Sequence, residues 1–175
     1  LSVGRRSSDD PRPIEVRRRE HLDKKFAAWV KEEAAGTVRW TTLHPASAKS
    51  NLPLLTVQPD DAVLASGDQS KRDVYDLTFA TNLPRITAIR IEALPDPSLP
   101  KNGPGRIYYE GPFGDFFLSE VSLHAGDKPL KLTDPSQSFA SGGNNAAAAI
   151  DGDPQTGWSI NGGQGRPHEA VFRLA

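Results

Sequence analysis

The spacing of apolar positions changes from a helical period to a strand period near Gly36. Before that glycine, one apolar stripe recurs at positions i, i+4, i+7 and i+8, as on one face of a helix. Its members are Leu22, Phe26, Trp29 and Val30. Pro13 suits a first helical turn and Gly36 suits a helix end. The pattern therefore predicts a helix over residues 14 to 35, preceded by a charged, proline-containing linker.

After Gly36, short apolar runs alternate with polar residues and are separated by turn-forming Pro, Asp and Gly, as expected for half-buried strands. The predicted strands are 38–42, 54–57, 62–64, 74–79, 86–94, 116–123 and 170–174. Residues 131–145 are polar and turn-like. We therefore expect an all-β fold, an antiparallel β-sandwich of jelly-roll type with an N-terminal helix. The expected division is a linker and helix over 1–36 and a β-sandwich module over 37–175.

The clearest motif is the run Ala-Ile-Asp-Gly-Asp-Pro-Gln-Thr-Gly-Trp, residues 149–158, called the Asp loop below. Hard cations such as calcium bind carboxylates, hydroxyls and backbone carbonyls. Asp151, Asp153 and Thr156 supply such oxygens within a short turn, so they are candidate calcium ligands. An ordinary turn is the alternative, because Asp, Gly and Pro favour turns for local reasons. Trp158 is expected to start a strand and to bury its ring beneath the loop, and it is also included among the ligand-binding candidates.

Composition narrows the choice of partners. The 175 residues include 21 Lys and Arg against 22 Asp and Glu, so no nucleic-acid or anionic-membrane partner is expected. No apolar stretch approaches the ~20 residues of a membrane span, so no membrane insertion is expected. The absence of cysteine excludes disulfides and zinc–thiolate sites within this chain. The chain begins at Leu1 without a signal segment, and we expect it to be a piece of a larger protein.

A second candidate surface follows a long proline and glycine loop, residues 94–106. Loops longer than about a dozen structureless residues are often functional. Arg106, Tyr108 and Tyr109 come at its end, and aromatic ring faces beside a guanidinium can stack on sugar C–H groups and bind hydroxyls. The alternative is that these residues are ordinary β-sheet side chains. The two interpretations stay open at this point.

Glu120 stands in the middle of an apolar run, where an unpaired buried carboxylate is costly. It either faces solvent or has a partner.

Catalysis is not expected, because the four histidines are scattered and no serine lies in a Gly-x-Ser-x-Gly elbow. Asp151 and Asp153 share one tight loop, which disfavours a glycosidase pair separated by ~5 to 9.5 Å.

The Asp loop resembles a loop of galactose-binding-like β-sandwiches, the group that includes discoidin-type domains and many carbohydrate-binding modules. That resemblance implies a structural calcium ion at the loop, with sugar bound elsewhere, and makes Glu120 in its Ser-Glu-Val strand a further candidate ligand. The stretch from about residue 26 to the end, with Gly-Pro-Gly-Arg, Phe-Phe-Leu-Ser-Glu-Val and the Asp loop, also resembles a module of large planctomycete cytochrome c-type proteins. In simple galactose-binding-like domains the Asp loop precedes the Ser-Glu strand, whereas here it follows.

These resemblances imply a function. We expect a non-catalytic carbohydrate-binding module of a larger exported, periplasmic or cell-envelope protein of cytochrome type. Its partners would be a polysaccharide or surface glycan and the other domains of that protein, and its cofactor would be calcium. The alternative is a structural or protein-interaction domain that positions redox domains and binds no small ligand.

Overall fold

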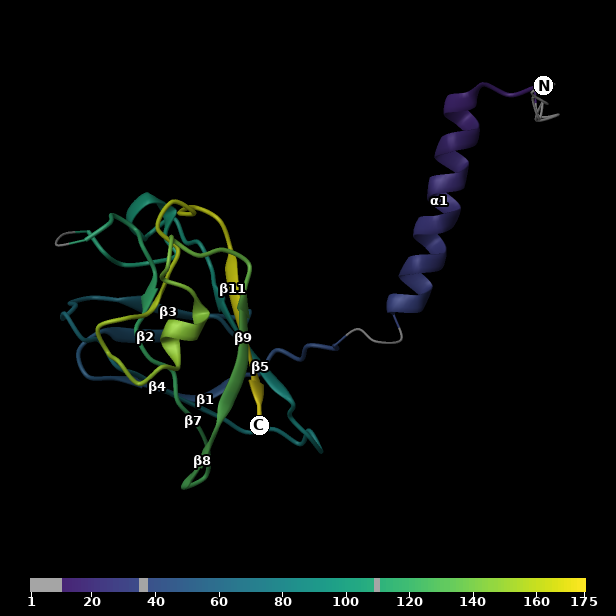
Figure 1. Cartoon of the computed structure of the whole chain (residues 1–175). Coiled ribbons are helices and arrows are strands. Elements are labelled where there is room, and N and C mark those ends of the chain that lie inside the picture. The colour runs from purple at the N-terminus through teal and green to yellow at the C-terminus, as the bar shows by residue number, and fades with distance from the viewer. Residues whose placement is uncertain (1–10, 35–37, 109–110) are drawn as a thin grey trace. The chain divides into compact units, whose positions relative to one another are not determined.

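The computed structural model describes residues 11–34, 38–108 and 111–175 (Figure 1). The chain forms two compact units, Leu1–Leu43 and His44–Ala175. The first unit contains the helix α1 (Ile14–Glu33), and the second contains all the strands among the described residues. The prediction of one N-terminal helix followed by antiparallel strands is confirmed at this level.

Helix α1 begins directly after Pro13, whose carbonyl accepts hydrogen bonds from the Val16 and Arg17 N–H groups. It ends at Glu33, two residues before the predicted end. No residue of α1 is buried, and its apolar stripe is exposed, with Leu22, Phe26 and Trp29 at 54%, 64% and 55%. The rings of Phe26 and Trp29 lie 5.8 Å apart. The helical period of the apolar stripe is thus sufficient to predict this helix.

The second unit is built from short antiparallel strands. They are β1 (Pro45–Ser50), β2 (Leu54–Val57), β3 (Val63–Ser66), β4 (Tyr75–Phe79), β5 (Ala88–Ala93), β6 (Phe117–Leu118), β7 (Leu123–Ala125), β8 (Lys128–Leu130), β9 (Leu132–Gln137), β10 (Trp158–Ser159) and β11 (His168–Leu174). Two 3-10 helices, η1 (Pro100–Asn102) and η2 (Ala146–Ala149), lie among them. The pairs are β1–β4, β2–β3, β6–β10 and β7–β8, and a three-stranded sheet has the order β5-β11-β9.

The core of the second unit lies on the three-stranded sheet. Trp158, Ile160 and Phe172 are fully buried, together with small alanines of β5, β11 and η2. The T-shaped contact between Phe116 and Trp158, with ring centroids 5.7 Å apart, joins the β6–β10 pair to this core. On β5 the side chains of Ile89 and Ile91 pack against the core, and Ala93 belongs to it. On the central strand β11, the buried residues His168, Ala170 and Phe172 alternate with more exposed ones, so alternation selects the residues that face the core.

A buried carboxylate holds the long loop that precedes β6. Asp115 is 3% exposed, and its oxygens accept hydrogen bonds from the Ser159 hydroxyl at 2.7 Å and the Ile160 N–H at 2.9 Å. Gly105 lies against the same backbone, where a Cβ atom would come within 1.6 Å of the Asp115 carbonyl oxygen. The loop therefore depends on glycine for its close approach and on Asp115 for its attachment to β10.

Three strand predictions need correction. The single strand predicted over 116–123 is interrupted, because the chain leaves β6 and the Val121 N–H donates to the Ala149 carbonyl instead of a strand partner. Residues 38–42 form no strand, whereas β1 begins at Pro45. The polar segment 131–145 contains β9, which pairs with β11. Partners distant in the sequence decided the first and third cases, because β6 pairs with β10 and β9 pairs with β11.

Within the described part of the chain, no helix combines the length and the apolar character that crossing a membrane requires.

Candidate functional site

The Asp loop is a series of turns closed by its own carboxylates. Asp151 Oδ1 accepts a hydrogen bond from the Asp153 N–H at 2.8 Å, and Asp153 Oδ1 accepts one from the Gln155 N–H at 2.9 Å. Gly152 between them has a φ of 84°, in the left-handed region that glycine adopts readily. Side chain to backbone bonds of this kind are the local reason that Asp favours turns. They shape the loop, and they leave the second carboxylate oxygen of Asp151 for another contact.

Several oxygen atoms converge on the Thr156 hydroxyl. Thr156 Oγ1 lies 2.8 Å from Asp151 Oδ2, 3.0 Å from the Asp153 carbonyl oxygen and 3.4 Å from the Ala148 carbonyl oxygen. A hydroxyl carries one proton, so it cannot donate a full hydrogen bond to all three oxygens. The Asp153 carbonyl oxygen also accepts a hydrogen bond from the Thr156 N–H at 3.1 Å, so the hydroxyl proton is available to the Asp151 carboxylate.

Glu120 joins this group from a distant part of the chain. Its Oε1 accepts a hydrogen bond from the Gly152 N–H at 2.9 Å. The Asp153 N–H and the Thr156 hydroxyl lower the pKa of Asp151, and a hydrogen bond with the Glu120 side chain contributes to the same shift. Two carboxylates at hydrogen-bonding distance repel each other unless a proton or a cation lies between them.

The oxygen set suits a hard cation in the type of its donor groups. It comprises carboxylates of Glu120 and Asp151, the Thr156 hydroxyl and the carbonyls of Ala148 and Asp153, which is the mixture that calcium binds. No cluster of three or more His, Cys, Asp or Glu side chains occurs among residues 11–34, 38–108 and 111–175. Here two carboxylates contribute, and the hydroxyl and carbonyl oxygens make up the rest. The Asp153 side chain caps the Gln155 N–H, so Asp153 offers its carbonyl to the cluster.

Trp158 is the last residue of the Asp loop and the first of β10, as the sequence predicted. Its ring is fully buried, and its Nε1–H donates a hydrogen bond to the Phe139 carbonyl at 2.8 Å. It belongs to β10, where it pairs with Leu118 of β6. A buried ring has no face for stacking on a sugar, so Trp158 supports the loop from below.

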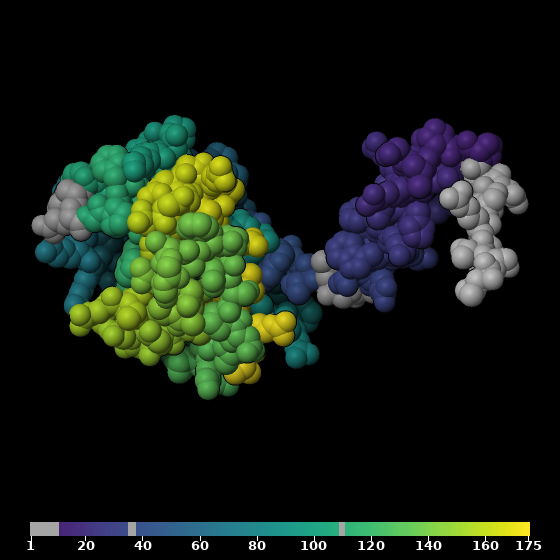
Figure 2. Space-filling view, turned by 45° about the horizontal axis from the view of Figure 1, so that its top comes forward, coloured from purple at the N-terminus to yellow at the C-terminus, as the bar shows by residue number. Residues whose placement is uncertain are grey.

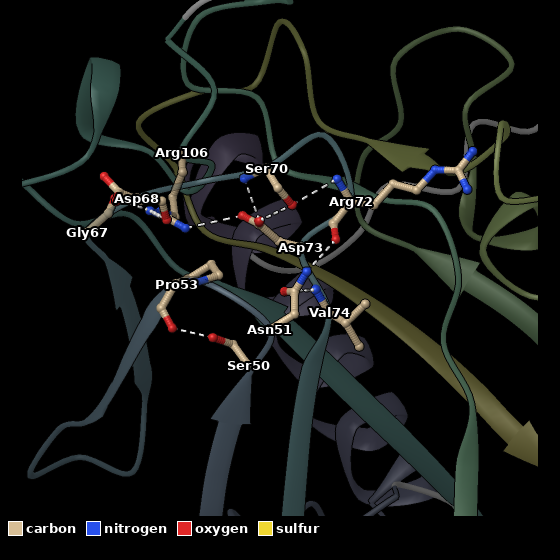
Figure 3. A network of polar contacts seen from close by, with 10 residues as sticks. All are labelled: Ser50, Asn51, Pro53, Gly67, Asp68, Ser70, Arg72, Asp73, Val74 and Arg106. Carbon is tan, nitrogen blue, oxygen red and sulfur yellow. Dashed lines mark hydrogen bonds and ion pairs between the residues drawn. The ribbon is translucent and has the colours of Figure 1, made fainter.

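Arg106 connects two loops of the second unit (Figure 3). Its Nη2 donates to the carbonyls of Gly67 at 2.6 Å and Asp68 at 2.9 Å, and its Nη1 lies 3.3 Å from Asp73 Oδ2. The other oxygen of Asp73 accepts hydrogen bonds from both the N–H and the hydroxyl of Ser70. The guanidinium of Arg106 is thus engaged by the protein itself, and its side chain is 14% exposed.

The aromatic surface predicted beside Arg106 is only partly within the described residues. Tyr109 lies outside them. Tyr108 is 57% exposed and Phe113 is 45% exposed. The Gly114 N–H donates to the Ile107 carbonyl at 2.6 Å, which brings the two arms of the loop together next to Tyr108 and Phe113. Tyr108 and Phe113 are therefore exposed aromatic residues on the two arms of one loop, whereas Arg106 is bound by other protein groups.

The sequence motifs identified only part of the oxygen cluster. The Ala148 carbonyl comes from η2, whose first turn is capped by the Asn145 side chain accepting from the Ala147 N–H. A backbone carbonyl has no residue-type signature, and nothing in the alanine run 146–149 marks one of its four carbonyls. The Asn cap before that run is the only local signal for the 3-10 turn that presents Ala148.

No protein-family model matches this chain, and no curated protein and no solved structure shows significant similarity to it.

Proposed function

We propose that the second unit is a non-catalytic carbohydrate-binding module with a structural calcium ion in the Asp loop. The observation that carries the proposal is the convergence of the Ala148, Asp151 and Asp153 oxygens on Thr156 Oγ1, at 2.8 to 3.4 Å. In this proposal a cation binds at this group of oxygen atoms, which are of the types that calcium prefers. Calcium also neutralises the Glu120 and Asp151 carboxylates, which otherwise repel each other.

Support for a sandwich comes from the shared core. Trp158 of β10 and Phe172 of β11 are both fully buried in one cluster, so the β6–β10 pair and the three-stranded sheet cover a common apolar interior. Two antiparallel sheets with one interior are the basic arrangement of a jelly-roll sandwich. We therefore propose the jelly-roll, galactose-binding-like form of this all-β unit.

The proposed glycan surface is the loop that presents Tyr108 and Phe113. Exposed aromatic rings suit the C–H face of a sugar, and a single site of this type binds weakly, with ~mM to μM dissociation constants. Repetition of weak sites would then give useful retention on a polysaccharide. In this proposal the module recruits a surface glycan or polysaccharide to a larger exported cytochrome-type protein in the periplasm or cell envelope.

Thermal unfolding with and without a calcium chelator tests the calcium site. A ligand that binds only the folded state, at 100 times its Kd, stabilises that state by ~2.7 kcal/mol, so chelation should lower the Tm. Asp151→Asn should abolish that shift. Asp127→Asn is the matched control, because Asp127 is an exposed carboxylate of the β7–β8 turn outside the oxygen cluster. An unchanged Tm in chelator, with no copurifying metal, would show that the Asp loop is only a turn.

Retention on polysaccharide gels tests the glycan surface. Replacing Tyr108 and Phe113 with Ala should reduce retention while the calcium-dependent Tm shift stays. Tyr75→Ala is the control, because Tyr75 is also an exposed aromatic residue but belongs to β4. Retention that survives the double substitution would place the glycan site elsewhere on the module.

One observation favours the alternative, a structural or interaction domain. Tyr75, Leu77 and Phe79 alternate along β4 and share one face of the strand, and they are 43%, 37% and 41% exposed. Contiguous exposed apolar residues often mark protein contacts. Failure to bind any neutral, acidic or sulfated glycan would make contact with other domains of the parent protein the better account.

A further inference from the structure

Among the residues that the structure describes, strand β4 has one hydrogen-bonded neighbour, β1, in a sheet of two strands. All five residues of β4 are exposed, and the core cluster of this unit, as far as it is described, includes no residue of β1 to β4. In the space-filling view, the green to yellow segments of the later strands cover the centre of the face in view, whereas the blue segments of the first strands appear at its margins (Figure 2). The pair β1–β4 therefore lies outside the packed core, and the edge of β4 that faces away from β1 is called the open edge below.

The backbone groups of an antiparallel strand point alternately towards its neighbour and away from it. The Asn51 N–H donates to the Val74 carbonyl at 3.3 Å, and the Val74 N–H donates to the Asn51 side chain at 2.8 Å, so the groups of Val74 point towards β1 (Figure 3). Alternation from Val74 directs the N–H and C=O groups of Tyr75, Leu77 and Phe79 to the open edge. No hydrogen bond joins these three residues to any described residue outside β1. Unpaired edge groups of this kind are a template for another strand.

The open edge is complementary to itself. When Leu77 lies opposite the same leucine of a second copy in an antiparallel pair, Tyr75 of each copy lies opposite Phe79 of the other. All three residues then exchange both of their backbone hydrogen bonds across the joint. Their side chains share one face of the strand, so a tyrosine ring meets a phenylalanine ring on each side of the central leucines. A twofold axis through the leucine pair relates the two halves, which is the commonest symmetry of protein dimers.

The charges on the other face of β4 favour this register over its neighbours. With Leu77 at the centre, Asp76 lies opposite Thr78 of the second copy, and within its own sheet it lies opposite Lys49 of β1. A shift of two residues in one direction would place the Asp76 carboxylates of the two copies directly opposite each other, where like charges are destabilising. The same shift in the other direction leaves Tyr75 without a strand partner, and a shift of one residue opposes outward groups with inward ones.

We propose that the open edge of β4 binds a second copy of this chain, and that the two copies form one antiparallel sheet of the order β1-β4-β4-β1. The occupant is a second copy because the outward backbone groups, the ring pairs and the charges all match in the same twofold register. The proposal is independent of the calcium and glycan sites. A joint of five residues from each copy is small beside the ~1,200–2,000 Å² of a stable interface, so we expect a dissociation constant in the ~μM to mM range.

Sedimentation equilibrium of the whole chain over that concentration range tests the proposal, and the Tm of each variant checks its folding. The mass of the wild type should rise from that of one chain towards that of two. Leu77→Lys and Leu77→Glu each place two like charges on the twofold axis and should weaken association at least about tenfold. An equimolar mixture of the two variants should associate again, because opposite charges then meet. Thr78→Lys is the matched control, since it adds the same charge to the same strand but opposite Asp76 of the second copy, and it should leave association intact.

Residue-resolved amide hydrogen exchange of the wild type gives a readout that needs no variant. Protection of the Tyr75, Leu77 and Phe79 N–H groups should increase with protein concentration, whereas that of the two residues between them, which point towards β1, should not. A wild-type chain that stays monomeric up to ~mM concentration overturns the proposal. Association that survives both substitutions of Leu77, or a mixture of the two variants that does not associate, also overturns it. Association that Phe26→Glu abolishes would place the contact on the exposed stripe of α1 and overturns it as well.

Discussion

The carboxylate of Glu120 accepts a hydrogen bond from the backbone N–H of Gly152 at 2.9 Å, although 32 positions separate the two residues. This contact joins the segment after β6 to the Asp loop. It is reinforced by the bond from the Val121 N–H to the Ala149 carbonyl at 2.8 Å. The oxygen cluster therefore belongs to two segments, and its geometry depends on how both are held against the core.

The first prediction concerns acid stability in the absence of calcium. Hydrogen bonds from the Asp153 N–H and the Thr156 hydroxyl lower the pKa of Asp151 below its ordinary value of 3.8. A lowered pKa in the folded state contributes stability above the unfolded pKa, and this contribution is lost as the pH falls through the folded pKa. In chelator, the Tm of the wild-type chain should fall more steeply below about pH 4 than that of Asp151→Asn. Parallel curves for the two proteins would contradict the prediction.

The second prediction has the opposite sign and concerns Asp115. Burial raises its pKa above 3.8, although hydrogen bonds from Ser159 and Ile160 act against this effect. A raised pKa contributes stability below the unfolded pKa, and that contribution is lost as the pH rises through the folded pKa. Asp115→Asn removes the charge and retains an acceptor for the Ile160 N–H. The stability of the wild type relative to Asp115→Asn should therefore decrease as the pH rises from about 3 towards 7, as measured by thermal unfolding. A pH-independent difference would count against it.

The third prediction separates a structural role for Arg106 from a ligand role. Hydrogen bonds to charged groups contribute ~1.5–3 kcal/mol each, so Arg106→Ala should lower the free energy of unfolding by about 2–3 kcal/mol. Arg106→Lys should restore little of it, because one ammonium does not reproduce the planar fork that reaches Gly67, Asp68 and Asp73. Arg85→Ala serves as an exposed control. Denaturant unfolding measures the difference, and equal stability of all variants would refute the structural role.

The fourth prediction concerns the backbone contact beneath the Asp loop. A Cβ atom on Gly157 would lie 2.6 Å from the Leu118 carbonyl oxygen and 2.8 Å from the Ser119 Cα. Backbone atoms cannot move aside as a flexible side chain does, so Gly157→Ala should cost about 1–3 kcal/mol. It should also weaken calcium binding, because β6 and the Asp loop would move apart. Gly143→Ala is the control, since a Cβ there meets nothing within 4 Å. Equal melting temperatures of the two variants would show that the strands can separate freely.

Local patterns in the sequence determined helix α1, strand β2 and the turn-rich, antiparallel character of the second unit. The apolar stripe of Leu22, Phe26 and Trp29 has the period of a helix, and this period does not depend on a partner. The turns of the Asp loop are equally local, because Asp151 and Asp153 bind backbone N–H groups two positions ahead. The burial of the large apolar ring of Trp158 next to these turns could also be predicted from the sequence.

Only the tertiary structure decided which oxygens meet and which aromatic rings stay exposed. The Glu120 carboxylate and the Ala148 carbonyl reach Gly152 and Thr156 through packing against a shared core, and no residue spacing encodes that approach. The guanidinium of Arg106 binds the loop of Gly67 and Asp73, more than 30 positions earlier in the chain. The Gly67 carbonyl and the Asp73 carboxylate accept its hydrogen bonds there. Long-range hydrogen bonds satisfy polar groups wherever the fold brings them together, so they follow the topology of the chain rather than its local order.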